Sequence, residues 1–222
     1  MRSTAELYDW ELRHVHHRVD EDVAFYAGLA GSVPAGAGAV LELACGTGRV
    51  AARLPQPVVG LDLDPAMLAV ARARGVRSVV CADMRRFSFG PARFGLIAIP
   101  YNSLQLLDTD GMVDCLRCAR DHLAPGGVVA LEATPFAAPA AVAPELLASV
   151  DGVTLVGSLE VGGDGVLHYH RRFTEGGDVY EDVVSIRSLD IGALCRVLDA
   201  AGLRLRTARQ DGTRVLATTI PV

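Results

Sequence analysis

The chain has 222 residues, of which 50% are hydrophobic and 21% are charged, so it is long and apolar enough to fold around a substantial core. Its formal net charge of −5 at pH 7 does not favour general attraction to nucleic acid or to an anionic membrane, and we expect neither as a partner. All 21 basic residues are arginine, which excludes a Schiff-base lysine and a P-loop lysine.

No stretch of the sequence predicts export or a membrane span. The first 22 residues carry charges throughout and lack the apolar core of a signal peptide, and the most apolar later stretch, 126–150, is interrupted by prolines and glutamates. The five cysteines lack the spacing of a secreted disulfide framework, and Cys115 and Cys118 lack the second pair that a zinc site needs. We therefore expect a cytoplasmic protein without a metal ion.

Helical and buried-strand patterns alternate along the first 133 residues. Residues 5–31 carry apolar side chains at roughly helical spacing, and a glycine- and proline-rich linker follows them. Short apolar runs then predict buried strands at 39–44, 57–61, 77–81, 94–99 and 128–133, with helices over 49–54, 64–75 and 109–123 between them. This alternation predicts a doubly wound, mostly parallel sheet with helices on both faces.

The pattern changes after residue 134. Glycine-rich turns separate three candidate strands at 153–161, 166–174 and 179–187, which predicts an antiparallel β insert after the fifth strand. A last helix over 190–201 and strands at 203–208 and 215–220 complete a sheet of seven strands.

We expect one domain over 1–222, and the insert and the N-terminal helices should close over its ligand site. Its expected parts are an N-terminal helical lid over 1–36, a core over 39–134, the β insert over 150–188 and a C-terminal helix with strands over 189–222.

The segment VLELACGTGRV, residues 40–50, contains the most informative turn. A buried strand that turns through Gly46 and Gly48 into a helix lets a ligand approach bare backbone N–H groups. On its own, Gly46-x-Gly48-x-x-Ala51 also fits a dinucleotide-binding fingerprint, so this turn leaves the cofactor open.

Two acidic residues further along the chain narrow the choice of cofactor. Asp62 ends the second strand, where its carboxylate can accept hydrogen bonds from both hydroxyls of a ribose. Asp83 and Met84 follow the third strand, where an acid can accept from an adenine amino group and a methionine can pack on the ring. Asp64 precedes Pro65 and is better explained as a helix cap.

These pieces together resemble the class I S-adenosylmethionine-dependent methyltransferases of the small-molecule type. The matching segments are VLELACGTGRV, VVGLDLDPAMLAVARARG, CADMRRF, FGLIAIPYNSLQLL and LAPGGVVALE, in the family's order over about residues 39–133. The resemblance implies a Rossmann-like fold with S-adenosylmethionine as cofactor.

The resemblance also implies roles for individual residues. It places the glycine loop beneath the methionine part of the cofactor, Asp62 at the ribose, and the next strand end at the adenine. The implied cofactor-binding residues are Tyr8, Glu42, Ala44, Gly46, Gly48, Asp62, Leu63, Asp83, Met84 and Pro100. The sequence departs from the family at Ala44, where the family has the first glycine of the loop.

The residues after the fourth strand should face the transferable methyl group. Pro100, Tyr101, Asn102 and Ser103 do not match the Asn/Asp-Pro-Pro-aromatic motif of methyltransferases that modify nucleic-acid amino groups. They either line a small-molecule pocket or form a turn beneath the next helix. Near the N-terminus, the Tyr8–Asp9 pair resembles the lid of small-molecule methyltransferases.

Methyl transfer needs a base only when the acceptor atom carries a proton. The catalytic candidates are Tyr101 and two histidines of the insert, His168 and His170, which share one face of a strand. One of the lid histidines is the alternative base. The lid contains a further cluster, His14, His16 and His17, which is more typical of a solvated helix face than of a metal site.

We therefore expect in-line methyl transfer from S-adenosylmethionine to an N or O atom of a small bacterial metabolite, with amino-sugar N-methyltransferases among the most similar enzymes. One alternative is a protein that binds the cofactor without transferring its methyl. Another is a nicotinamide-dependent oxidoreductase, which the lack of lysine and the short Gly48–Asp62 spacing disfavour. The exposed edges of the insert also suggest a homodimer.

Overall fold

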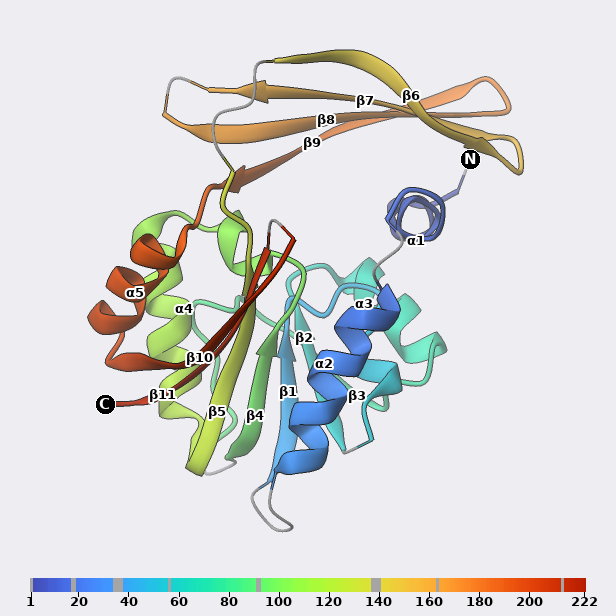
Figure 1. Cartoon of the computed structure of the whole chain (residues 1–222). Helices are drawn as coiled ribbons and strands as arrows, with labels where there is room; N and C mark the ends of the chain where they lie inside the picture. The colour runs from blue at the N-terminus through green and yellow to red at the C-terminus, as the bar shows by residue number, and fades with distance from the viewer. Residues whose placement is uncertain are drawn as a thin grey trace.

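The central sheet of the computed structural model has the strand order β10-β11-β5-β4-β1-β2-β3 (Figure 1). β11 runs antiparallel to both of its neighbours, and the other neighbouring strands pair in parallel. The strands are β1 (Ala39–Leu43), β2 (Val58–Asp62), β3 (Ser78–Cys81), β4 (Phe94–Ile99), β5 (Leu123–Ala133), β10 (Leu203–Asp211) and β11 (Arg214–Pro221). This confirms the predicted mostly parallel sheet of seven strands.

The structure describes residues 2–16, 19–33, 38–55, 57–90, 93–136, 141–162, 164–212 and 214–222. His17, one of the three lid histidines, and the centre of the linker before β1 lie outside these ranges. Within the described ranges, no helix combines the length and the apolar character that crossing a bilayer requires.

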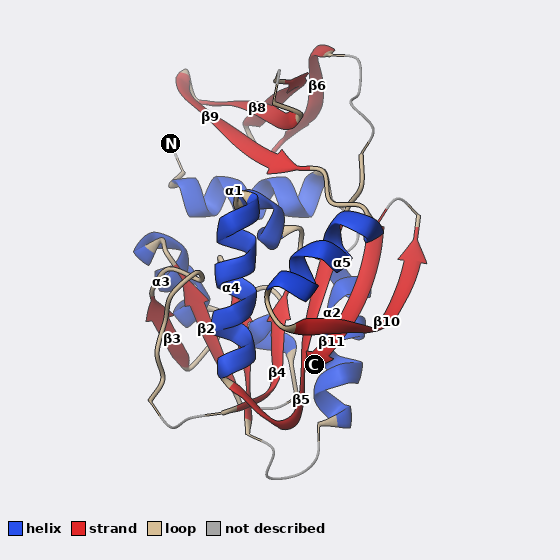
Figure 2. Cartoon of the chain, turned by 90° about the vertical axis from the view of Figure 1, so that its left-hand side faces the viewer, coloured by secondary structure: helices blue, strands red, loops and turns tan. Residues whose placement is uncertain are grey.

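Both faces of the sheet are covered, which explains why its central strands are continuously apolar. Leu41 and Ile97 pack in the cluster formed with α4 (Thr109–Asp121) and α5 (Ile191–Ala200), which Figure 2 shows side by side on one face. Val40 and Leu96 pack against α2 (Val19–Ser32) on the opposite face. β4 is consequently buried at every residue.

The N-terminal segment is two helices with different environments, not one helical lid over 1–36. α1 (Thr4–His14) starts with a capping box between Ser3 and Glu6 and lies between the sheet and the insert (Figure 1). α2 belongs to the core, because its Tyr26 is fully buried and donates a hydrogen bond from its hydroxyl to the carbonyl of Ile99 (3.5 Å). Only α1 therefore occupies the position of a lid, and we call it the lid helix.

The predicted helix over 49–54 is wrong. Only a short 3₁₀ helix, η1 (Ala51–Arg53), forms there, and Leu54 is already extended. Pro55 follows Leu54, and a residue before proline avoids the helical region. The segment after the glycine loop is therefore one tight turn, and it keeps Arg49 next to the loop.

The insert is a four-stranded antiparallel sheet in the order β6-β7-β8-β9. Its strands are β6 (Val142–Val150), β7 (Val153–Val161), β8 (Val166–Glu175) and β9 (Asp178–Arg187). The three predicted strands are confirmed, but the insert begins earlier than residue 150, because the alanine- and proline-rich stretch also forms an edge strand. Pro144 is compatible with that position because an edge strand leaves backbone groups unpaired.

The two chain crossings between core and insert are bonded to each other. The buried side chain of Gln105, in η2 (Ser103–Leu106), donates to the carbonyls of Thr134 (2.9 Å) and Arg187 (2.5 Å) and accepts from the N–H of Thr134 (2.7 Å). Ser188 bonds both backbone groups of Phe136 beside it. These bonds join both chain crossings to the segment that follows β4. They therefore hold the insert over the C-terminal edge of the sheet.

Candidate functional site

The turn after β1 is left-handed at three positions. Ala44, Gly46 and Gly48 have φ of 51°, 53° and 73°. A Cβ on Gly48 would lie 2.7 Å from Cγ2 of Val76 and 3.2 Å from the Cα of Ala71, so only glycine fits there. The loop therefore approaches α3 (Pro65–Ala73) closely and leaves its own backbone uncovered for a ligand.

Asp62 organises this loop from the end of β2. Its carboxylate accepts hydrogen bonds from the N–H of Gly46 (2.7 Å) and from the N–H of Asp64 (2.9 Å). A carboxylate has about four acceptor positions, so Asp62 can still accept from two ligand hydroxyls. Asp64 caps α3 by accepting from Ala66, which agrees with its interpretation as a helix cap.

Two oppositely charged side chains are buried beside the loop with atoms that lack partners. Among the described residues, Oε2 of Glu42 and Nη1 of Arg49 have no hydrogen-bond partner. Burial raises the pKa of Glu42 to about 8, although Arg49 and the backbone of Ala51 act in the opposite direction. Buried polar atoms without hydrogen bonds are costly, so this pair has the capacity to bind one positive and one negative group.

Arg49 also forms the floor of the site. Its guanidinium lies 3.8 Å from the ring centroid of Tyr101, and its Nη1 lies 3.7 Å from Oδ2 of the fully buried Asp22. Asp22 in turn pairs with Arg214, whose Nη1 lies 3.3 Å from Glu132. The floor is therefore a buried ionic cluster that brings together α2, β5, β11 and the glycine loop.

The residues assigned to the adenine lie at the next two strand ends. Leu63 is 69% exposed, which is unusual for a leucine and leaves an open apolar surface beside Asp62. Met84 is half-buried against the main core. Asp83 already binds the side chain and backbone N–H of Arg85, and these bonds hold the pKa of the carboxyl below its usual range. An adenine amino group would therefore share Asp83 with Arg85.

The end of β4 is strained. Tyr101 and Asn102 have φ of 60° and 58°, and consecutive left-handed residues other than glycine are uncommon. Asn102 accepts a hydrogen bond from the hydroxyl of Thr134 (2.8 Å), and the buried Ser103 donates to the carbonyl of Pro100 (2.7 Å). Ser103 thus closes the turn, whereas Tyr101 is held over Arg49 at the edge of the site.

The lid helix lies across the glycine loop. The ring of Tyr8 lies 3.7 Å from the position of a Cβ on Gly46, and burial raises the pKa of its hydroxyl. Asp9 accepts from the hydroxyl of Thr47 (2.5 Å) and pairs with Arg74 of the loop after α3. The structure therefore places Tyr8 over the loop, and Asp9 fastens the lid helix beside it.

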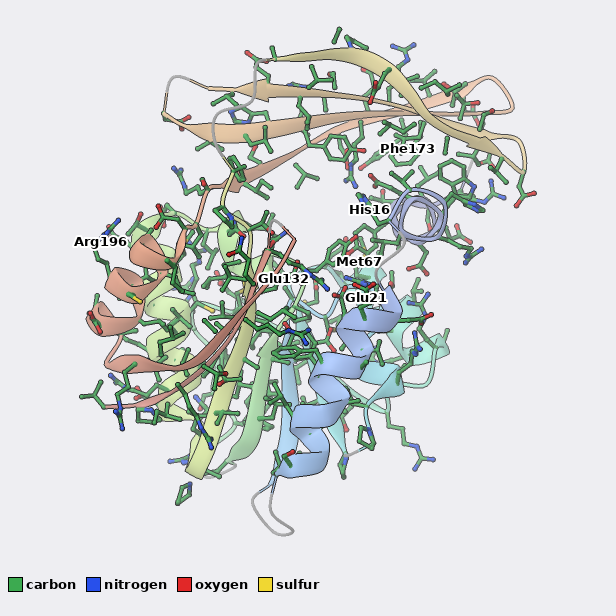
Figure 3. All side chains as sticks on the ribbon, in the orientation of Figure 1. His16, Glu21, Met67, Glu132, Phe173 and Arg196 are labelled. Atoms are coloured by element: carbon green, nitrogen blue, oxygen red, sulfur yellow. The ribbon has the colours of Figure 1, made fainter. Side chains whose placement is uncertain are left out.

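The other side of the lid helix is fastened to the insert. Glu11 is 2% exposed and accepts from the hydroxyl of Tyr169 (2.9 Å) and from Nη1 of Arg171 (2.6 Å). Trp10 packs edge-on against Phe173, which Figure 3 shows pointing from the insert toward the lid helix. The lid helix therefore bridges the glycine loop and the insert.

His168 and His170 lie on the opposite face of the insert. Side chains alternate along a strand, so these two point away from Tyr169, Arg171 and the lid helix. His168 bonds the hydroxyl of Ser185 (2.8 Å), and His170 lies 3.5 Å from the carboxylate of Glu160. We correct the expectation that they act as bases, because this face is turned away from the core.

Two residues at the site, Arg49 and Glu11, have no place among the sequence candidates. Arg49 directly follows the glycine loop, so its position in the sequence could have identified it as a site residue. Glu11 lies on the helix that carries Tyr8, but its partner Arg171 is 160 residues away, and no local pattern predicts that contact. His16 lies within 6.0 Å of Tyr101 between ring centroids and belongs to the predicted histidine cluster.

We predict that Ala44→Gly stabilises the protein by up to about 1 kcal/mol. A left-handed alanine costs about 1–2 kcal/mol, and the greater freedom of glycine in the unfolded chain offsets about 0.5–1 kcal/mol of the gain. Urea unfolding measures the difference. Ala69→Gly, at an exposed helical position of α3, is the control and should cost about 0.5–1 kcal/mol. Equal destabilisation by both changes would contradict the strain at Ala44.

We also predict that Glu42→Gln changes how stability depends on pH. The pKa of Glu42 is higher in the folded chain, about 8, than its usual 4.5, so its contribution to stability is present at low pH and is lost between about pH 4.5 and 8. Glutamine mimics the protonated carboxyl. Relative to pH 5, the variant should therefore gain at least about 1.4 kcal/mol over the wild type at pH 8, measured by urea unfolding. Glu160→Gln, on the surface, should give a parallel curve; a parallel curve for Glu42→Gln would refute the prediction.

Comparison with known proteins agrees with this geometry. Residues 40–127 match the family model described as a methyltransferase domain. The chain is 32% identical over 177 residues to dTDP-3-amino-3,6-dideoxy-alpha-D-glucopyranose N,N-dimethyltransferase of Streptomyces fradiae, an alignment that covers 78% of this chain and 66%, just under two thirds, of that relative.

Solved structures share the whole fold. DesVI of Streptomyces venezuelae superposes with a TM-score of 0.81 at 25% identity over 100% of both chains. CalS10, an amino pentose methyltransferase from Micromonospora echinaspora, superposes with a TM-score of 0.77 at 24% identity over 100% of this chain and 99% of its own, and its structure contains S-adenosylmethionine. The matched segment, the strand order and the lidded glycine loop show that residues 40–127 form a methyltransferase domain and that the chain has the fold of these solved structures.

Proposed function

We propose that the chain transfers the methyl group of S-adenosylmethionine to the amino nitrogen of a small sugar-like metabolite. The observation that carries the proposal is the buried pair of Glu42 and Arg49, each with an atom that has no hydrogen-bond partner among the described residues. The α-amino acid end of S-adenosylmethionine has one ammonium and one carboxylate. Glu42 would bind the first, and Arg49 the second.

The remaining cofactor residues fit the same molecule. Asp62 would accept from the ribose hydroxyls, and the exposed Leu63 would cover one face of the adenine. Gly46 and Gly48 let the backbone approach, and Tyr8 would close over the methionine end. When bound, the cofactor supplies a methyl group on a sulfonium that is already a good leaving group.

Because the leaving group is built in, most of the effect comes from holding the acceptor in line with the bond that breaks and from excluding water. Tyr101 and Asn102 at the end of β4, the lid helix, and the inner face of the insert are the parts available for that purpose. An amino nitrogen is favoured over a hydroxyl because the relative from Streptomyces fradiae is named for N,N-dimethylation of an amino sugar. We extend that acceptor class, and the in-line mechanism, to this chain.

The outer face of the insert supports a homodimer as a further part of the proposal. Leu146, Val179 and Val183 are 63%, 47% and 50% exposed there. The ion pair of Arg172 with Glu181 lies on the same face, so it carries both signs of charge and can match a second copy of itself.

We predict that labelled methyl passes from S-adenosylmethionine to dTDP-3-amino-3,6-dideoxy-α-D-glucopyranose, or to another amino sugar in a panel of such compounds. The 3-hydroxy counterpart should not accept it. Thermal unfolding with S-adenosylhomocysteine and with NAD is the binding control, because ligand at a hundred times its Kd stabilises by about 2.7 kcal/mol.

The outcomes separate the candidate functions. Stabilisation by S-adenosylhomocysteine without transfer to any amino sugar would indicate a binding protein or a different acceptor, and would refute the proposed reaction. Stabilisation by NAD alone would support the oxidoreductase.

For the dimer, we predict that Val183→Glu weakens self-association at least tenfold in sedimentation equilibrium, because a charge would be buried without a partner. Ile191→Glu is the matched control, since Ile191 is 44% exposed at the start of α5 and outside the insert. A wild-type chain that sediments as a monomer at all concentrations would refute the dimer.

A further inference from the structure

The described histidines differ in their access to the site. His168 and His170 lie on the outer face of the insert, and His14 packs on Trp10 (5.0 Å between ring centroids). His122 bonds the carbonyl of Cys118 at the far end of β4, where its own carbonyl accepts from Phe94. Only His16, among them, contacts a residue at the C-terminal edge of the central sheet.

His16 lies directly after the lid helix and reaches two parts of the site. Its Nε2 is 3.5 Å from Oε1 of Glu11, and its ring meets that of Tyr101 edge-on at 6.0 Å. Figure 3 shows it on the side of the lid helix that faces the inside of the molecule. His16 is thus next to Tyr101, which the sequence resemblance places where the methyl group is transferred.

We infer that His16 is the general base of the reaction and that Glu11 is its positioning residue. The inference rests on the proposed function and deepens it. An acceptor amine that arrives as an ammonium ion has no lone pair, so it must lose a proton before it can attack a methyl group.

Glu11 is suited to orient the imidazole. Burial alone would raise its pKa, but His16, Arg171 and Tyr169 together hold the pKa below its usual value, so Glu11 remains an anion. Its bonds to the insert fix its position. A fixed carboxylate that binds the N–H at Nε2 leaves Nδ1 without a proton, and Nδ1 is then the acceptor.

The step balances without any further reactant. Nδ1 of His16 takes one proton from the ammonium and leaves a neutral amine. The nitrogen lone pair forms the new C–N bond while the C–S bond breaks, and the sulfur keeps the electron pair. The products are a methylated ammonium and S-adenosylhomocysteine, and the imidazolium returns its proton to water.

Other charged groups surround His16 and bear on its titration. Tyr101 faces it from the end of β4, and Glu11 faces it from the lid helix with Tyr169 and Arg171 of the insert bound behind. A pocket of about 410 Å³ adjoins the ring, and the charged residues that share its lining with His16 are Asp9, Arg13, Asp20, Arg49, Arg53 and Arg74. Because none of these six pocket residues is changed in the variants below, a change in the pH profile reports on His16 and Glu11.

The test compares kcat/KM against pH for the wild type, His16→Asn and Glu11→Gln, with the amino sugar that the wild type methylates fastest. The wild type should show a plateau, bounded below by protonation of an imidazole and above by loss of the acceptor's ammonium form. His16→Asn should lose about 10²–10⁴-fold at neutral pH and should follow only the neutral fraction of free amine, rising tenfold per pH unit. Glu11→Gln should move the acid limb to lower pH, because the imidazolium loses its anion.

Two controls keep the result interpretable. His170→Asn is the same substitution on the outer face and should leave the profile unchanged. The Kd for S-adenosylhomocysteine, measured by calorimetry, should change less than threefold in His16→Asn.

An unchanged pH profile in an active His16→Asn would overturn the inference and leave the proposed function standing. A large rise in the Kd for S-adenosylhomocysteine with an unchanged profile would make His16 a cofactor ligand instead. A wild type that methylates no amino sugar refutes the proposed function itself and this inference with it.

Discussion

The site depends on a helix that is held on two sides by charge. Asp9 ties the lid helix to Thr47 and Arg74 beside the glycine loop, and Glu11 ties it to Tyr169 and Arg171 of the insert. Without these contacts an eleven-residue helix would be marginal in water, since short helices draw most of their stability from packing. The same contacts put Tyr8 over the loop, so the element that closes the cofactor site also supports the insert.

The charge balance beneath the lid is uneven in a way that suits a cationic ligand. Among the described residues of this cluster, the buried acids Asp22, Glu42 and Glu132 outnumber the buried arginines Arg49 and Arg214 by one. The excess is resolved at Glu42 and Glu132, where burial raises the pKa of both carboxyls. Burying an unpaired anion is expensive, so a proton or a ligand's ammonium must neutralise the cluster. The stability of the empty site and its affinity for a cation are therefore linked.

The sequence was sufficient for features that follow local rules. β4 could be predicted because a strand covered on both faces must be apolar throughout, and the glycine loop because only glycine fits beside Val76 and Ala71. β6 was missed because its proline and exposed positions carry no alternating pattern, and its pairing with β7 stabilises it. The hydrogen bond that Arg171 donates to Glu11 joins residues 160 apart, and the choice between the two faces of β8 depends on that contact.

The strain at the end of β4 explains how the parts act together. Tyr101 and Asn102 hold left-handed conformations because Arg49 stacks on one and Thr134 bonds the other. Thr134 is also the residue whose backbone Gln105 bonds, at the chain crossing from the core into the insert. A movement of Arg49 toward a bound carboxylate would therefore displace Tyr101, which it contacts, and then the chain crossing at Thr134. This one turn therefore joins the glycine loop, the end of β4 and the chain crossing into the insert through direct contacts.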